Sequence, residues 1–360
     1  MIRQRQSVDI LENQALASYT TLGVGGSARF LIEAVDESQV FAGMDFALSK
    51  GLPVFILGGG SNILASDAGF PGLVIRVALR GIVSKPELGP GVVDVGAGEN
   101  WDRFVSWAVE RDLAGIECLS GIPGTAGGTP VQNVGAYGQE VGEVISSVRV
   151  IDRESFSIRE LGAAECRFSY RASLFNTIGR DRYIVLAIRF RLLPRGDPRI
   201  EYADLKRFFF RLTKCPSLAE TREAVLRIRA SKGMLLEPDC PDSRSAGSFF
   251  KNPVVTGKAA AEIEETARGR GHLHPSDAIP VFRAPGDMVK LSAAWLIENS
   301  GFHKGYAHGR AGLSSKHVLA LVNLGGATAA EIMELASVVR AGVKERFGVE
   351  LCLEPVLVGW

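Results

Sequence analysis

At Val54-Phe55-Ile56-Leu57-Gly58-Gly59-Gly60-Ser61-Asn62, four apolar residues lead directly into three glycines. A short apolar run that ends at turn-forming residues is typical of a buried β-strand. The glycines let the backbone turn sharply and point successive N–H groups at one position, which is the geometry that holds a pyrophosphate without a lysine. Considered alone, the triplet is equally consistent with a flexible surface turn.

A second glycine-rich segment lies at Gly121–Gly138; we call it the second glycine loop, and Gly58–Asn62 the first glycine loop. The second loop is too long and too apolar for a solvent-exposed connection, and many of its positions leave no side chain to block a close approach. Two such loops suit a long dinucleotide that lies in a crevice and is bound mainly by backbone groups. The pair therefore favours FAD over a small ligand.

A looser phosphate motif occurs at Gly23-Val24-Gly25-Gly26-Ser27-Ala28, which matches G-x-G-x-x-A. A Rossmann dinucleotide site requires a strand before this motif and a helix after it. The residues that follow, Arg29–Glu33, are strand-like, so we predict a tight turn between strands instead. The P-loop pattern G-x-x-x-x-G-K-[ST] does not occur in the sequence, which argues against a P-loop kinase or ATPase.

Helices and strands alternate in the first third of the chain, and capping residues and apolar periodicity mark their ends. We predict helices that begin at Asp36, Asn100, Ser217, Leu291 and Thr328, and strands over residues 54–57, 73–77, 92–95, 147–151, 183–193 and 349–358. These elements predict an α+β protein. They divide into a first lobe over residues 1–80, a second lobe over residues 81–219 and a C-terminal domain over residues 220–360, whose last strand is a candidate to return to the N-terminal lobes.

The composition limits the kinds of binding partner and the cellular compartment that we expect for this protein. The 360 residues carry 41 Lys and Arg against 40 Asp and Glu, so the formal charge is +1. This balance argues against a nucleic acid or an anionic membrane as partner. No signal peptide or membrane span is apparent, and the five scattered cysteines form neither a metal pair nor a disulfide framework. We therefore expect a cytoplasmic protein without a metal site.

Eight segments together resemble, in family order, the UDP-N-acetylenolpyruvoylglucosamine reductase (MurB) family of flavoenzymes, which act in peptidoglycan precursor synthesis. These segments are Thr20–Gly26, Leu57–Leu64, Gly96–Trp101, Ile122–Gly138, Cys166–Arg171, Ala246–Pro253, Ala294–Glu298 and Leu353–Pro355. The resemblance implies a two-lobed FAD-binding region of the PCMH/vanillyl-alcohol-oxidase type and a C-terminal α/β substrate lobe. It also implies an NADPH-dependent reduction of UDP-N-acetylglucosamine enolpyruvate to UDP-N-acetylmuramate.

The resemblance assigns the FAD to residues of both glycine loops. The expected cofactor residues are Leu57, Gly58, Gly59, Gly60, Ser61, Asn62, Ile122, Pro123, Gly124, Gly128, Thr129, Gly135, Ala136 and Tyr137. No histidine or cysteine beside either loop is placed for a covalent link, and Cys118 belongs to a segment that looks like packed core. We therefore expect the FAD to be bound non-covalently. We also expect the protein to be a monomer.

The implied reaction needs a group that stabilises negative charge on the substrate carboxylate and a group that donates a proton. Arg171 fits the first task because a guanidinium stays charged and can bind a carboxylate with two hydrogen bonds. Glu354, next to Pro355 in an apolar segment, is the second candidate if burial keeps it protonated. Ser248 is the candidate proton donor, between Gly247 and two phenylalanines.

The same resemblance implies which residues bind the substrate. The expected residues are Tyr202, Arg229, Lys232, Asn252, Lys290 and His317. Arg229 and Lys232 lie at the basic end of one predicted helix, where they are candidates to bind the UDP diphosphate. The segment around Tyr202 resembles the longer subtype of the family, yet residues 254–285 lack the tyrosine that this subtype carries in a mobile loop.

Two other functions remain open at this stage. One is a different FAD oxidoreductase of the same flavin-binding fold, such as an oxidase of hydroxy acids or sugars, although such enzymes lack the Gly247–Phe250 segment. The other is a UDP-sugar-binding or regulatory protein without activity. The presence of Arg171, Ser248 and Glu354 together argues against that second alternative.

Overall fold

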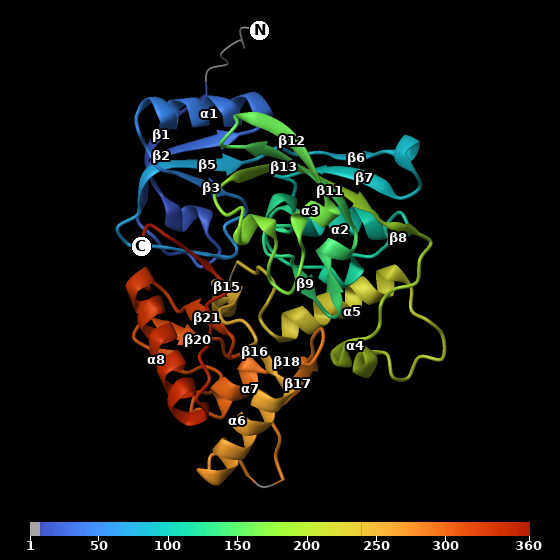
Figure 1. The fold of residues 1–360 in the computed structure, drawn as a ribbon, viewed down its shortest axis with the longest axis vertical. Helices are drawn as coiled ribbons and strands as arrows, with labels where there is room; N and C mark the ends of the chain where they lie inside the picture. The colour runs from blue at the N-terminus through green and yellow to red at the C-terminus, as the bar shows by residue number, and fades with distance from the viewer. Residues whose placement is uncertain (1–7, 239, 275) are drawn as a thin grey trace. The chain divides into compact units, whose positions relative to one another are not determined.

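The computed structural model describes residues 8–238, 240–274 and 276–360. Its contacts divide the chain into two compact units (Figure 1). Among the described residues, the first unit consists of residues 8–14, Ala28–Gly60 and Phe70–Ser231, and the second of Ala15–Ser27, Ser61–Gly69 and Lys232–Trp360. Each unit has its own cluster of buried apolar side chains.

The first unit begins with a four-stranded sheet in the order β1-β2-β5-β3. Its elements are β1 (Leu11–Ala15), β2 (Ser27–Ala34), α1 (Glu37–Ser49), β3 (Val54–Leu57) and β5 (Phe70–Val77). β5 pairs in parallel with both β2 and β3. The Asp36 side chain accepts a hydrogen bond from the Gln39 N–H at 2.9 Å and so begins α1, as expected of an N-cap. β2 begins at Ser27 within the Gly23–Ala28 motif, so a strand and not a helix follows the motif, as predicted. The element before the motif is a 3₁₀ helix, Leu16–Tyr19, and not the predicted strand.

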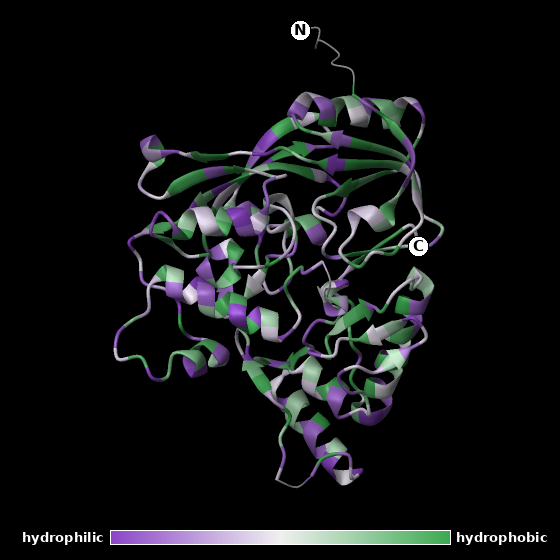
Figure 2. Cartoon of the chain, turned by 180° about the vertical axis from the view of Figure 1, so that it is seen from behind, coloured by the Kyte–Doolittle hydropathy of each residue, from purple (hydrophilic) through white to green (hydrophobic). Residues whose placement is uncertain are grey.

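A five-stranded antiparallel sheet, in the order β12-β11-β13-β7-β6, follows in the same unit. Its strands are β6 (Ile82–Ser84), β7 (Val92–Gly96), β11 (Ile145–Asp152), β12 (Ser157–Gly162) and β13 (Tyr183–Arg191). Hydrophobic residues run along these long strands in Figure 2. α2 (Trp101–Val109) packs on the sheet through Trp101 and Phe104, whose rings lie 6.1 Å and 4.9 Å from that of Phe190.

Shorter elements complete the first unit. They are β8 (Leu113–Ala114), β9 (Gly135–Ala136), β10 (Gln139–Glu140), α3 (Ala163–Cys166), β14 (Leu193–Pro194), α4 (Ala203–Phe208) and α5 (Leu218–Ser231). The Ser217 and Glu220 side chains form a reciprocal capping box at the start of α5: Glu220 accepts from the Ser217 N–H at 2.7 Å, and Ser217 accepts from the Glu220 N–H at 3.2 Å. α5 therefore begins where the sequence predicts.

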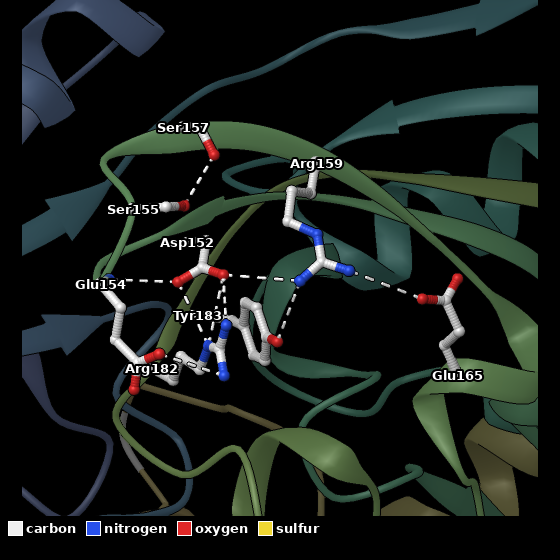
Figure 3. A network of polar contacts seen from close by, with 8 residues as sticks. All are labelled: Asp152, Glu154, Ser155, Ser157, Arg159, Glu165, Arg182 and Tyr183. Carbon is white, nitrogen blue, oxygen red and sulfur yellow. Dashed lines mark hydrogen bonds and ion pairs between the residues drawn. The ribbon is translucent and has the colours of Figure 1, made fainter.

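A network of charged side chains joins β11, β12 and β13 (Figure 3). Asp152, at the end of β11, is 1% exposed and accepts hydrogen bonds from Arg182 Nη2 at 2.7 Å and from the Glu154 N–H at 3.1 Å. Arg159 reaches from β12 to Asp152 Oδ2 at 3.5 Å and to Glu165 at 3.7 Å. The hydrogen bonds from Arg182 lower the pKa of Asp152 to about 2, so its carboxylate is charged at neutral pH.

The second unit combines three small sheets with three helices. Its elements are β4 (Ile63–Ala65), β15 (Ser245–Ser248), β16 (Val254–Thr256), α6 (Gly257–Gly269), β17 (Val281–Arg283), β18 (Met288–Leu291), α7 (Ala293–Glu298), β19 (Ala307–His308), β20 (Ala311–Leu313), β21 (Ala320–Asn323), α8 (Ala329–Phe347) and β22 (Val356–Val358). The sheets have the orders β15-β21-β20-β19, β16-β18-β17 and β22-β4. The buried face of α8 packs Ile332, Leu335 and Val339 into this core.

The C-terminal strand is shorter than the predicted 349–358, because Val356–Val358 pairs only with the three residues of β4 and Leu353 makes an isolated bridge to Phe250. β22 thus returns to a segment within residues 1–80. The α+β class is confirmed, whereas the boundaries at residues 80 and 219 stay predictions. Even α8, the longest helix that the structure describes, lacks the apolar length needed to cross a membrane, and no shorter described helix meets that requirement.

Candidate functional site

The first glycine loop leaves β3 at the buried Leu57 and touches the backbone of the second loop. A Cβ added at Gly59 would lie 2.5 Å from the Cα of Gly124, and one added at Gly58 would lie 2.9 Å from Thr125 Oγ1. Glycine is therefore required where the two loops meet. The structure brings the two predicted loops together within the first unit.

The second glycine loop contains two non-glycine residues in the left-handed region, Asn133 with φ 45° and Tyr137 with φ 49°. Such conformations are sparsely populated and persist when the surroundings hold them. The buried Asn133 side chain donates to Glu140 Oε2 at 2.7 Å and to the Ser169 carbonyl at 3.0 Å, and accepts from the Gly142 N–H at 2.9 Å. Sequence analysis missed Asn133, which fixes the shape of this loop.

Three observations show that this part of the first unit fits a pyrophosphate-containing cofactor. The glycines bring the two loop backbones close together. Thr125 Oγ1 is buried between the loops without a hydrogen-bond partner among the described residues, so it offers an unused donor and acceptor. A Cβ built at Gly128 meets no described atom within 4 Å, which leaves space beside the loop. Backbone N–H groups, a hydroxyl and open space are the features that bind a pyrophosphate without a cation.

Arg171 lies against the second glycine loop. It occupies a tight turn in which Ser169 and Ala172 exchange backbone hydrogen bonds, and its own φ is 54°. Its Nη2 donates to the Gly135 carbonyl at 2.9 Å, and Asn176 Nδ2 donates to the Arg171 carbonyl at 3.1 Å. The structure thus places this candidate catalytic residue beside the predicted cofactor residues Gly135 and Ala136.

Two substrate candidates of the first unit, Tyr202 and Arg229, lie beside Tyr137 at the end of the second glycine loop. The rings of Tyr137 and Tyr202 lie 5.5 Å apart, edge to face. Burial raises the pKa of Tyr137 to about 12 and also raises that of Tyr202. Arg229 is 7% exposed and hydrogen-bonded to the Tyr137 side chain, and burial lowers its pKa. Arg229 is therefore not an exposed cation at a helix end.

The second unit brings Ser248 and Glu354 together through its backbone. Ser248 ends β15 opposite Ala320, and the next residue, Phe249, donates its N–H to the Leu319 carbonyl at 2.7 Å. The Glu354 N–H in turn donates to the Phe249 carbonyl at 3.0 Å. Phe249 and Phe250 are buried while Ser248 and Glu354 are half-buried, so the two candidates lie at the edge of an apolar core.

Asn62, a cofactor candidate, joins the same region of the second unit. Its Nδ2 donates to the Glu354 carbonyl at 3.3 Å, and its own carbonyl accepts from the Val356 N–H at 2.9 Å. Three residues from separate motifs therefore meet around the C-terminal segment. No spacing rule in the sequence predicts this contact, because 292 positions separate Asn62 from Glu354.

The remaining substrate candidates of the second unit are less closely grouped. Burial, together with the positive charges of Lys232 and Lys304, lowers the pKa of His317 to about 4, so His317 is neutral near cations at pH 7. Asn252 Oδ1 accepts from the Ala293 N–H at 2.9 Å and so holds the start of α7. Lys290 lies in β18, between Val254 and Phe282 of the neighbouring strands.

No group of three or more His, Cys, Asp or Glu side chains within residues 8–238, 240–274 and 276–360 is placed to hold a metal ion. The five cysteines are free thiols. Burial raises the pKa of Cys118 and Cys166, the latter to about 12, so neither is a reactive thiolate at neutral pH.

Two family models and several known proteins match the chain. The model of an FAD binding domain matches residues 28–159, and the model of the C-terminal domain of UDP-N-acetylenolpyruvoylglucosamine reductase matches residues 239–358. The reductases of that name from Thermobifida fusca and Nocardia farcinica are 46% and 47% identical, over 96% and 97% of this chain and 97% and 90% of theirs. The crystal structure of the Thermus caldophilus enzyme superposes with a TM-score of 0.65 at 27% identity, covering 98% of this chain and 99% of that one. The chain therefore belongs to the UDP-N-acetylenolpyruvoylglucosamine reductase family.

Proposed function

We propose that this protein reduces UDP-N-acetylglucosamine enolpyruvate to UDP-N-acetylmuramate with NADPH through bound FAD. The observation that carries this proposal is similarity over the full length to reductases of that name. The contact between the two glycine loops, the bond from Arg171 to the Gly135 carbonyl and the backbone pairing of Ser248 with Glu354 through Phe249 are compatible with it. The protein is thus an FAD-dependent oxidoreductase of peptidoglycan precursor synthesis.

FAD, when bound, supplies the hydride carrier between NADPH and the substrate. The residues that would hold it are the expected members of the two glycine loops together with Thr125, whose buried hydroxyl has no partner among the described residues. Backbone N–H groups of Gly58–Gly60 and of Gly124 and Thr125 would bind the pyrophosphate. The next three N–H groups of the loop, from Ala126 to Gly128, already donate to backbone carbonyls. Neither Cys118 nor a histidine is proposed as a covalent anchor, since Cys118 is buried and protonated.

Arg171 and Glu354 are proposed to bind the substrate carboxylate and to stabilise the negative charge that develops on it. Arg171 is held by the Gly135 carbonyl through one nitrogen. A planar guanidinium carries several N–H donors in a geometry that matches a carboxylate. The backbone of Glu354 is held on both sides: its N–H donates to the Phe249 carbonyl, and its carbonyl accepts from Asn62 Nδ2. A protonated carboxyl there donates a hydrogen bond to the developing enolate.

Ser248 is proposed as the proton donor to the α-carbon of the enolpyruvyl group. It ends β15 next to two buried phenylalanines, which limit the access of water on that side. A serine hydroxyl is a weak acid, so it serves here only because the carbanion-like intermediate is strongly basic.

Tyr202, Lys232, Asn252, Lys290 and His317 are proposed substrate contacts. Lys232 and the neutral His317 lie near each other in the second unit, and a cation beside a hydrogen-bonding imidazole suits a diphosphate. We further propose that the protein binds no nucleic acid or membrane, because its charge is balanced, and that it acts in the cytoplasm, because its five cysteines form no disulfide framework. We propose a monomer as the acting form.

Product analysis tests the proposed function. The purified protein is incubated with NADPH and the enolpyruvyl UDP-sugar, and the nucleotide sugar is analysed by mass spectrometry. We expect the substrate to gain two hydrogens for each NADPH consumed, and FAD to be released by acid or heat. Consumption of NADPH with oxygen and an unchanged sugar would favour the oxidase alternative, and binding of the sugar without turnover would favour a regulatory protein.

A further inference from the structure

Helix α5 is tied to both ends of the second glycine loop by charged side chains. At the start of the loop, Asp102 Oδ1 accepts from the Gly121 N–H at 2.6 Å. Arg222 of α5 binds the same carboxylate with two hydrogen bonds, at 2.6 Å and 2.8 Å. The two bonds to the guanidinium and the bond from Gly121 offset the effect of burial and lower the pKa of Asp102. This end of the loop is therefore anchored to α5 through a charged pair.

At the other end of the loop, Arg229 of α5 is hydrogen-bonded to Tyr137. Both residues are 7% exposed, so the bond is shielded from water. The negative charge of Asp102 also attracts the Arg229 guanidinium, so the contacts at the two ends of the loop belong to one electrostatic cluster. A buried guanidinium that already binds a hydroxyl and lies near a carboxylate is poorly placed to bind a diphosphate from solvent.

The helix geometry explains why only some of the cations of α5 take part. Arg222 and Arg229 are seven residues apart, which is about two helical turns, so they project from the same face. Arg227 projects from another face: its side chain is 66% exposed and pairs with Glu223. α5 thus carries two guanidinium groups that face the loop, the half-buried Arg222 and the buried Arg229, and a separate solvent-exposed cation, Arg227.

We propose that Arg229 is a positioning residue of the second glycine loop, acting on it through Tyr137, and not a ligand of the UDP diphosphate. This inference rests on the proposed function, since it concerns the FAD site of that reaction. Tyr137 holds a left-handed backbone conformation directly after Gly135–Ala136, the segment whose carbonyl binds Arg171. Arg229 therefore supports both the cofactor loop and the orientation of Arg171. Lys232, which lies in the second unit, is left as the cation for the diphosphate.

The test compares two affinities in the same set of variants. FAD is titrated into the apoprotein and followed by flavin fluorescence, and UDP is titrated into the FAD-loaded protein by calorimetry. For Arg229→Gln and for Tyr137→Phe we expect the dissociation constant of FAD to rise about tenfold or more, the size expected when a buried hydrogen bond to a charged group is lost. The dissociation constant of UDP should change less than about twofold.

Three further variants complete the comparison. The double variant Arg229→Gln/Tyr137→Phe should weaken FAD binding little more than either single variant, because both remove the same interaction. Lys232→Gln should weaken UDP binding and leave FAD binding unchanged. Arg227→Gln, on the exposed face of α5, should alter neither affinity.

Weaker UDP binding with unchanged FAD binding in Arg229→Gln would overturn the inference and restore the ligand role. Additive effects of Arg229→Gln and Tyr137→Phe would also overturn it. If Arg229→Gln does not fold, Arg229→Lys and Tyr137→Phe are used in its place to test the inference. Normal FAD affinity together with a normal circular dichroism spectrum of the bound flavin in Tyr137→Phe would count against the inference. Failure of the wild-type protein to bind FAD would instead refute the proposed function.

Discussion

In the first unit, the candidate residues lie on loops whose shape depends on buried side-chain bonds, whereas in the second unit they lie beside backbone pairings. Asn133, Arg229 and Asp102 each hold a part of the second glycine loop, and Arg171 rests on it. Ser248 and Glu354 are placed by backbone hydrogen bonds of Phe249. The difference teaches that buried supporting side chains set the geometry of the candidates in the first unit, whereas backbone pairing sets it in the second. We therefore expect replacement of supporting residues to matter in the first unit and replacement of the candidates themselves to matter in the second.

Replacement of Ser248 gives the largest expected effect and tests the second half of the comparison. Removal of a positioned general acid typically slows the reaction by about 10²–10⁴-fold. In Ser248→Ala we expect NADPH to reduce the flavin at a nearly normal rate, because this step needs no proton from Ser248. Reoxidation by the enolpyruvyl UDP-sugar should be slowed by that factor, as measured by anaerobic stopped-flow absorbance.

Two controls accompany this variant. Ser248→Cys retains a proton and should recover part of the lost rate, and Ser337→Ala, on the exposed face of α8, should behave as wild type. Equal slowing of both half-reactions in Ser248→Ala would mean that Ser248 shapes the site without donating a proton.

Replacement of Arg171 tests whether the first unit supplies more than a positive charge. Arg171→Lys keeps the charge but loses both the planar pair of donors and the bond to the Gly135 carbonyl. We expect reoxidation of the reduced flavin by substrate to slow by about 10- to 100-fold, in line with the loss of charge-assisted hydrogen bonds. A wild-type rate in this variant would show that a point charge suffices.

Replacement of Gly128 tests the space beside the second glycine loop. A Cβ at Gly128 meets no described protein atom within 4 Å and its φ is not positive, so Gly128→Val should fold. We expect the dissociation constant of FAD to rise about tenfold, because the added side chain occupies space that the cofactor needs. Gly269→Val, at an equally open position in α6, is the matched control. Gly59→Val is less informative, since its side chain would collide with Gly124 and disturb the loops themselves.

Replacement of Asp152 gives the smallest expected effect and leaves the site intact. The folded-state pKa of Asp152 is about 2, below its ordinary value of 3.8, so its contribution to stability is complete above pH 3.8 and is lost as the pH falls toward 2. Asp152→Asn should lower the free energy of unfolding by roughly 2 kcal/mol at pH 7 and by much less near pH 2. Urea unfolding measures both values, and Asp181→Asn, whose side chain is 81% exposed, is the control. An equal loss at both pH values would contradict the pKa assignment.

Local signals predict much of this fold. The Asp36 and Asn100 caps and the capping boxes at Ser217 and Thr328 fix helix starts, because each depends on side chains within three or four residues. The first glycine loop is likewise visible as a strand that runs into glycines. The C-terminal strand is overestimated, since its apolar alternation continues beyond the three residues that find a partner in β4.

The supports of the site are harder to predict because their partners are distant in the sequence. Asn133 binds Ser169, 36 residues away, and asparagine in a glycine-rich segment is first interpreted as a turn residue. The role of Arg229 has a local signal that sequence analysis did not use: its seven-residue spacing from Arg222 separates both from Arg227. Only the contact with Tyr137 shows that this face of α5 lies against the second glycine loop.

The absorbance of the purified protein, followed without oxygen, tests the central claim most directly. NADPH is added first and the enolpyruvyl UDP-sugar second, in a single cuvette. We predict that the protein carries a flavin spectrum, that NADPH bleaches it, and that the UDP-sugar restores it with stoichiometric formation of UDP-N-acetylmuramate. A protein that stays colourless when FAD is supplied, or a reduced flavin that only oxygen can reoxidise, would contradict the account.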